Sequence, residues 1–93
     1  MLRIEKIVTG NHTIIRLSGR IEAKHVPELK KQVENDPRPI AMDLEDLKLV
    51  DAGAVRFLGS SEIIGIELWN CPPFVREWIR RERQRLSWRE GRA

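Results

Sequence analysis

The sequence predicts an α/β domain of order β-β-α-β-α-β-α, with helices packed on a mixed sheet of four strands. Short segments that alternate apolar and polar residues are interleaved with segments whose apolar residues recur at the helical period. The chain has 93 residues, which is enough for one domain with one core. Apolar residues make up 41% of it and charged residues 33%, a composition that excludes intrinsic disorder.

The first two strands are predicted to pair as an antiparallel hairpin. Residues 2–8 alternate well enough for a strand, and residues 13–17 are rich in β-branched side chains. Gly10 and Asn11 form the turn between the two strands, and Gly19 ends the second one.

A helix and a third strand follow the hairpin. The apolar residues of this helix recur one turn apart, at Val26, Leu29 and Val33. Pro27 is tolerated only in a first turn, so the helix begins near residues 23–25, and the two prolines of residues 35–39 end it. Residues 40–44 alternate as a strand. Because a helix connects the second and third strands, we expect them to pair in parallel, with the third strand central in the sheet.

A second helix and a fourth strand complete the predicted sheet. Asp51 has the chemistry of an N-cap, since its carboxylate can accept hydrogen bonds from the free N–H groups of a first turn. Val55, Leu58 and Ile63 are expected to face inward, and Gly65 is expected to end the helix. The residues that follow, 66–69, alternate as the fourth strand.

The last helix is predicted to begin near Pro72 and Pro73 and carries the charge imbalance of the chain. Residues 71–93 hold 7 arginines and 3 glutamates, whereas residues 1–70 hold 10 basic and 11 acidic residues. Arginine clusters neutralise phosphates, so a nucleic-acid arm is one interpretation of this segment. Three glutamates interrupt the basic run, which is typical of the polar face of a surface helix, and a nucleic-acid partner is therefore not expected.

The sequence argues against several classes of protein. No apolar run approaches the ~20 residues of a membrane helix, and charges interrupt the first residues. We therefore expect a cytoplasmic protein without membrane insertion. Cys71 is the only cysteine, so no intrachain disulfide can form, and with two histidines it lacks the ligand spacing of a zinc site.

No catalytic or cofactor site is expected either. The acidic residues between Asp43 and Asp51 lack the glycine and the terminal glutamate of a calcium loop, so no metal site is expected. Neither a phosphate-binding glycine loop nor an oriented nucleophile and base occurs. Cys71 lies near a predicted helix N-terminus, an environment that can lower a thiol pKa, but no partner base accompanies it.

Two segments resemble the STAS domain, the fold of bacterial anti-sigma-factor antagonists. Residues 13–23 resemble the family's second strand, its glycine and the acidic residue that follows, with Glu22 where aspartate is common. Residues 43–58 align without a gap to the family's Asp-Leu-Ser-x-Val-x-x-hydrophobic-Asp-Ser-Ser-Gly-Leu signature. The resemblance covers residues 2–81 and implies a STAS-like fold. We expect one such domain over residues 1–86 and a basic tail over residues 87–93.

The resemblance also implies a partner-binding surface. In antagonists that switch by phosphorylation, the acceptor is the serine or threonine directly after the motif aspartate, which is Asp51 here. That position holds Ala52, which has no hydroxyl, so Ala52 is a non-functional equivalent of the phosphoacceptor. The loop of residues 46–51 and the start of the following helix are expected to present small residues and a carboxylate around a free helix N-terminus. The residues of this expected surface are Asp46, Asp51, Ala52, Gly53, Ala54 and Arg56.

By this resemblance the chain is a non-enzymatic regulator of transcription that binds an anti-sigma factor or a serine-kinase-like protein without a phosphorylation switch. An alternative is a STAS-type accessory subunit of the ATPase in a lipid-transporting ABC system, because such subunits also resemble this chain. A nucleic-acid binder that uses the arginine-rich last helix is a further alternative. Both a monomer and a homodimer are compatible with these interpretations.

Overall fold

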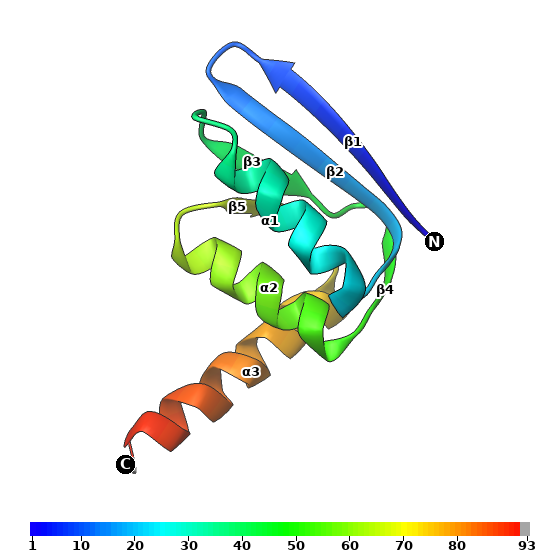
Figure 1. The fold of residues 1–93 in the computed structure, drawn as a ribbon. Helices are drawn as coiled ribbons and strands as arrows, with labels where there is room; N and C mark the ends of the chain where they lie inside the picture. Colours follow the sequence, from blue (N-terminus) through cyan, green and yellow to red (C-terminus); the bar gives the residue numbers. More distant parts are fainter. Residues whose placement is uncertain (92–93) are drawn as a thin grey trace.

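Strands and helices succeed one another along the chain in nearly the predicted order (Figure 1). The computed structural model describes the backbone of residues 1–91 and the side chains of residues 1–85. The elements are β1 (Leu2–Thr9), β2 (His12–Ile21), the 3-10 turn η1 (Ala23–His25), α1 (Val26–Glu34), β3 (Ile40–Asp43), β4 (Leu47–Val50), α2 (Ala52–Ile63), β5 (Glu67–Trp69) and α3 (Pro73–Gly91). No helix among the described residues is both long and apolar enough to cross a membrane.

The sheet is mixed, and β2 is its most extensively paired strand. β1 pairs antiparallel with β2 along the whole hairpin. On the opposite edge of β2, β3 pairs in parallel with residues 13–16, and β4 pairs in parallel with residues 19–21. β5 then pairs in parallel with the outer edge of β3. The predicted parallel crossover and the central position of the third strand are therefore confirmed.

The sheet has five strands, and the prediction of four was wrong. The missed strand, β4, lies within a segment interpreted as a loop. A turn separates it from β3, in which Oδ1 of Asp43 accepts a hydrogen bond from the N–H of Glu45 at 3.1 Å. β2 accommodates its change of partner by a register shift between Gly19 and Arg20. Gly19 has a φ of 91°, a conformation that favours glycine.

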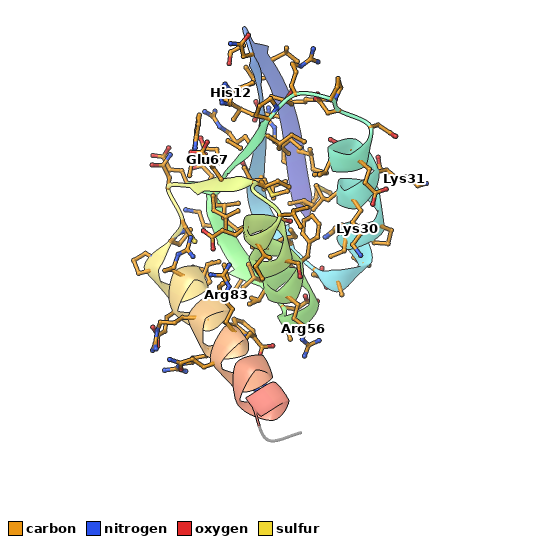
Figure 2. The ribbon with its side chains drawn as sticks, turned by 90° about the vertical axis from the view of Figure 1, so that its left-hand side faces the viewer. His12, Lys30, Lys31, Arg56, Glu67 and Arg83 are labelled. Atoms are coloured by element: carbon orange, nitrogen blue, oxygen red, sulfur yellow. The ribbon has the colours of Figure 1, made fainter. Side chains whose placement is uncertain are left out.

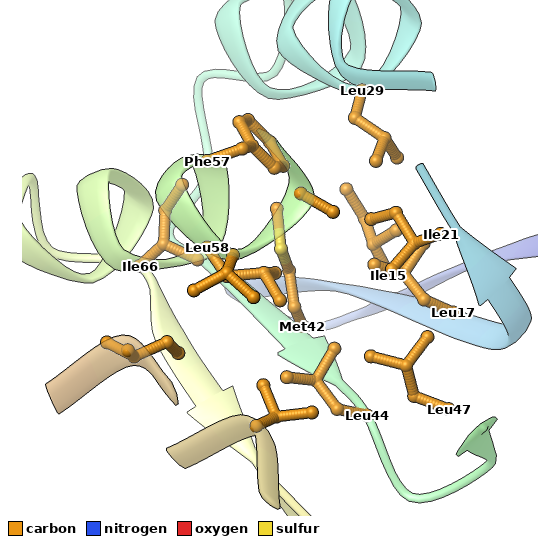
Figure 3. Close-up of a cluster of buried hydrophobic side chains, with 14 of the residues drawn as sticks. Ile15, Leu17, Ile21, Leu29, Met42, Leu44, Leu47, Phe57, Leu58 and Ile66 are labelled. Carbon is orange, nitrogen blue, oxygen red and sulfur yellow. The ribbon is translucent and has the colours of Figure 1, made fainter. Parts of the chain in front are cut away.

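One face of the sheet is covered by α1 and α2 (Figure 1). The hydrophobic core lies between these two helices and the sheet (Figure 3). The helices contribute Leu29, Val55 and Leu58 to this core, and α3 adds Val75 and Ile79. Each of these side chains is at most 1% exposed, and burying one of this size stabilises the fold by about 1.5–3 kcal/mol.

Two expectations at the helix ends have different outcomes. Gly65 follows the end of α2 with a φ of 102°, so the predicted stop is confirmed. Ile63 was expected to face inward, but its side chain is 73% exposed, whereas Ser61 in the same turn is 3% exposed. Ile63 follows Leu58 by five residues, which places it about 140° around the helix from that buried side chain. The structure does not describe the side chains of residues 87–93, so the basic tail predicted over these residues stays a prediction. The backbone of α3 extends to Gly91.

Candidate functional site

β4 leads into α2 at a corner of the molecule, and Asp51 lies at this junction. Asp51 is the N-cap of α2, with extended backbone at φ −108° and ψ 175°. Its Oδ1 accepts a hydrogen bond from the N–H of Ala54 at 2.8 Å, and its Oδ2 accepts one from the N–H of Ala23 at 2.9 Å. These backbone hydrogen bonds, with that from Ala23 foremost, lower the pKa of the Asp51 carboxyl. The predicted N-cap is confirmed.

The start of α2 is not a free helix N-terminus, and that part of the expectation was wrong. The 3-10 turn η1 packs directly against it. A Cβ atom on Gly53 would lie 2.5 Å from the Cβ of Ala23, far inside contact distance. Gly53 therefore allows the close approach of η1 and α2, and the Asp51 carboxylate is already occupied by hydrogen bonds within the chain.

The residues expected to bind a partner differ in their exposure. Asp46 and Arg56 are exposed, whereas Asp51, Ala52 and Gly53 are half-buried. Ala54 is fully buried and belongs to the hydrophobic core, so its inclusion in the surface is corrected. The reason is the helical period, which turns the third residue of α2 toward the sheet.

Arg56 is held in place by α3. Its Nε lies 3.3 Å from Oε1 of Glu82, and Oε2 of Glu82 lies 3.1 Å from Arg85. Glu82 is only 8% exposed, while the side chain of Arg56 is 59% exposed. A buried carboxylate that binds two arginines restricts the Arg56 guanidinium yet leaves most of it accessible.

Sequence reasoning missed one residue of this corner, Leu49. Its side chain is 52% exposed on β4, two residues before the N-cap of α2. The local sequence carries no signal for this exposure, because it follows from the pairing of β4 with β2. We call the accessible residues Asp46, Leu49, Ala52 and Arg56 the docking corner.

Asp43, an acidic residue near this corner, forms its contacts within the chain. Oδ1 of Asp43 accepts a hydrogen bond from Nδ2 of Asn70 at 3.2 Å, and its Oδ2 lies 3.5 Å from Nε of Arg16. The Asp43 carboxylate is thus paired with Arg16 and hydrogen-bonded to Asn70. Among the residues that the structure describes, no three His, Cys, Asp or Glu side chains are grouped so that they could hold a metal ion.

The surroundings of Cys71 and His25 indicate structural roles for both side chains. Burial raises the pKa of the Cys71 thiol, with the nearby Arg76 acting in the opposite direction, so the position near a helix N-terminus does not lower it. A thiol with a raised pKa is a poor nucleophile at neutral pH. His25 closes η1, because its Nδ1 accepts a hydrogen bond from the N–H of Glu22 at 3.0 Å.

The described arginines of α3, from Arg76 to Arg85, are paired with carboxylates. Glu62 of α2 accepts hydrogen bonds from both Arg76 and Arg83, at 2.7–2.8 Å. Glu77 binds Arg80 and Arg81 on the same helix. Arginines engaged in this way are less available to phosphates, which weighs against a nucleic-acid arm.

No protein-family model matches the chain, and the comparison with curated proteins finds no match either. Solved structures do match. A STAS-domain antisigma-factor antagonist from Rhodobacter sphaeroides has a TM-score of 0.56 and 14% identity over 74% of this chain and 86% of its own. The anti-sigma factor antagonist SpoIIAA, in its unphosphorylated form, has a TM-score of 0.61 and 20% identity over 83% of this chain and 79% of its own.

A third similar structure is Mglu, with a TM-score of 0.55 and 16% identity over 74% of this chain but only 19% of its own. Identities of 14–20% show similarity of fold alone. The mixed sheet, the two helices on one face and the likeness to the two antagonists show that the chain has a STAS-like fold, as the sequence resemblance implied.

Proposed function

We propose that this chain, with its STAS-like fold, is a non-enzymatic regulatory module that binds a protein partner through the docking corner. The likeness to two anti-sigma-factor antagonists supports the proposal. The proposed partner is an anti-sigma factor or a serine-kinase-like protein, and the proposed setting is transcription regulation in the bacterial cytoplasm.

The observation that carries the proposal is the methyl group of Ala52 in the first turn of α2. The sequence resemblance aligns Ala52 with the phosphoacceptor of switching antagonists. A phosphate there would add a charge of about −1.5 to −2 to a surface that must fit closely against a partner. Because Ala52 has no hydroxyl, the docking corner keeps one charge state at this position. Binding is then controlled by the amount of protein or by competition.

The geometry of the corner suits a protein partner. Ala52 is small and half-buried, so a partner's backbone can approach the helix closely. Leu49 offers an exposed apolar side chain, and Arg56 offers a guanidinium whose position is restricted by Glu82. Arginine is enriched among the residues that dominate the binding energy of interfaces, and the exposed leucine adds apolar area to the same surface.

The substitution Ala52→Glu tests this function. A glutamate in the first turn of a helix interacts favourably with the helix dipole, so the variant should fold. Asp51 is unsuitable for the purpose, because its loss would remove the cap of α2 and the contact with Ala23. Ala52→Ser is the matched control, since it adds one hydroxyl without charge.

The partner is first identified by affinity purification of the tagged protein from its native host and mass spectrometry, and its Kd is then measured for each variant. We expect Ala52→Glu to weaken binding by at least about tenfold and Ala52→Ser to bind like the wild type. If the partner bound Ala52→Glu as tightly as the wild type, the docking corner would not be the interface. Co-purification of the ATPase of a lipid-transport system would instead favour the accessory-subunit alternative.

A further inference from the structure

The end of α2 carries two adjacent isoleucines that the fold does not bury. The side chains of Ile63 and Ile64 are 73% and 74% exposed, whereas Ile66, two residues further on, is 7% exposed. Single exposed apolar residues are common on protein surfaces. Ile63 and Ile64 are adjacent and both exposed, so together they form an apolar area that a partner can cover.

One groove lies beside Ile64, between α1 and α2. Its volume is about 140 Å³. Its apolar lining comes from Val33, Phe57 and Ile64, and its polar lining includes Lys30, Glu34 and Ser60.

A second groove lies beside Ile63, between α2 and α3, with a volume of about 180 Å³. Its apolar lining comes from Val55, Ile63 and Ile79, and its polar lining includes Arg56, Glu82 and Arg83. Pockets for drug-sized molecules have volumes of about 300–1,000 Å³, so both grooves fit protein side chains better than a small molecule.

Basic side chains dominate the accessible charge around α2. Figure 2 shows Lys30 on α1, Arg56 on α2 and Arg83 on α3. Lys30 is exposed and forms no ion pair within the described part of the chain, and the side chain of Arg56 is 59% exposed. Arg83 is already paired with Glu62, so it contributes less to the accessible charge. Glu82 is occupied by Arg56 and Arg85, so Glu34 is the one carboxylate on the groove linings without an ion pair among described residues. This distribution suits an acidic partner segment.

The accessible residues along α2 and at its C-cap form a ridge between the two grooves. Ala52 is half-buried, and the others are exposed: Arg56, Ser60, Ile63 and Ile64. Their spacing of three to four residues places most of them on one side of the helix. From its first to its last residue the ridge is about 18 Å long at 1.5 Å per residue, which corresponds to about three helical turns. A helix laid across such a ridge inserts side chains into the grooves on both sides.

We propose that this ridge binds an acidic amphipathic helix of the partner protein, with Ile63 and Ile64 as apolar anchors and with Lys30 and Arg56 pairing acidic side chains. The inference rests on the proposed function, because Arg56 and Ala52 belong to both surfaces. It extends the interface from the docking corner to the opposite end of α2.

The test uses a display library of helical peptides of about 18 residues, selected against the immobilised full-length chain. We expect the selected peptides to be amphipathic and acidic, and we expect Ile63→Ser/Ile64→Ser to weaken their binding by at least about tenfold in fluorescence anisotropy. Val8→Ser is the matched control, because Val8 is also an exposed apolar residue, at 52%, but lies on β1. Both variants should keep the wild-type Tm, since they change exposed side chains.

Three outcomes would overturn the inference: a selection without binders, selected peptides that are basic, and peptides that bind Ile63→Ser/Ile64→Ser as tightly as Val8→Ser. Self-association of the wild type in sedimentation that is lost in Ile63→Ser/Ile64→Ser would also overturn it, because a second copy would then cover the ridge. The proposed function is read separately. If Ala52→Glu blocks the natural partner while Ile63→Ser/Ile64→Ser binds it normally, only the inference about the ridge fails.

Discussion

Single residues at the start of α2 serve the chain's own packing as well as its surface. Asp51 caps the helix and also binds the backbone of η1, and Gly53 leaves the room that Ala23 occupies. A substitution of Asp51 or Gly53 therefore affects the stability of the fold as well as the binding of a partner. Ala52 is the exception, because its side chain makes none of these contacts.

The first prediction compares two glycines of α2. Gly53→Ala would place a Cβ 2.5 Å from that of Ala23, whereas a Cβ at Gly59 would meet Ile79 at an ordinary 3.5 Å. We expect Gly53→Ala to lower the free energy of unfolding by about 1–3 kcal/mol, as in other overpacked sites. Gly59→Ala should leave it unchanged or raise it by up to about 1 kcal/mol, because alanine favours the helix. Urea denaturation of both variants measures the difference, and equal stabilities would contradict the close contact.

The second prediction concerns acid. Oδ2 of Asp36 accepts a hydrogen bond from the Thr13 hydroxyl at 2.6 Å, and its Oδ1 accepts one from the N–H of Arg38 at 2.9 Å. These bonds, with that from Thr13 foremost, lower the pKa of Asp36 in the folded state. A lowered folded pKa means that its stabilising contribution is complete above the unfolded value of about 4 and is lost as the pH falls through the folded pKa.

We therefore expect Asp36→Asn to lower the Tm at pH 7 and to reduce the fall of Tm between about pH 4 and pH 2. Glu34→Gln, which changes an exposed carboxylate on α1, is the control. Circular dichroism melting curves across this range provide the measurement. A Tm for Asp36→Asn that follows the wild type at every pH would show that the Thr13 contact contributes nothing to stability.

The N-cap at Asp51 could be predicted from the sequence because capping depends on neighbouring residues. The burial of Ala54 and the contact between Gly53 and Ala23 could not, because they depend on where η1, a segment distant in sequence, packs against α2. Leu49 was missed for a related reason: its exposure follows from the pairing of β4 with β2.

Among the elements, those with a single dominant period were predictable. β1, β2 and α1 have clear alternation or a clear apolar stripe, and the bounds of β1 and α1 agree closely with expectation. β2 continues past Gly19, its expected end, to Ile21, because its last residues pair with β4. β4 has only four residues and follows a pair of acidic residues, so local pattern favoured a loop. Its strand conformation comes from the edge of β2 that β3 leaves unpaired, which is a property of the sheet.

A prediction at this scale concerns the link between α2 and α3. Glu62 binds Arg76 and Arg83 across the two helices, whereas Glu77 binds two arginines within α3. We expect Glu62→Gln to lower the free energy of unfolding by about 1 kcal/mol, since the pair is partly screened by solvent. Glu77→Gln should have little effect on stability. If denaturation shows the same loss for both, the contact between helices contributes no more than a surface pair does.

In the whole molecule, α3 is part of the core although it comes last in sequence. Val75 and Ile79 are at most 1% exposed, and their combined burial of about 3–6 kcal/mol is a large share of the 5–15 kcal/mol expected for a whole domain. The predicted domain of residues 1–86 keeps both side chains.

The corresponding prediction is a pair of truncations. A chain that ends after residue 86 should melt cooperatively, within a few degrees of the full chain, whereas one that ends after residue 72 should not fold. Differential scanning calorimetry distinguishes the two. A folded chain of residues 1–72 would show that α3 is dispensable for the core, and failure of residues 1–86 to fold would place the domain boundary further along.

The double pairing of β2 has a consequence for synthesis on the ribosome. The hairpin of β1 and β2 can close once residue 21 has emerged, but the other edge of β2 waits for β3 and β4, which end at residue 50. At about 5–20 residues per second, that edge stays open for roughly 1–6 s in the nascent chain. During this interval Ile15 and Leu17 lack the cover of α2, which follows β4 in the chain. A chaperone that binds extended apolar segments would therefore find its site at two side chains that are fully buried in the finished fold.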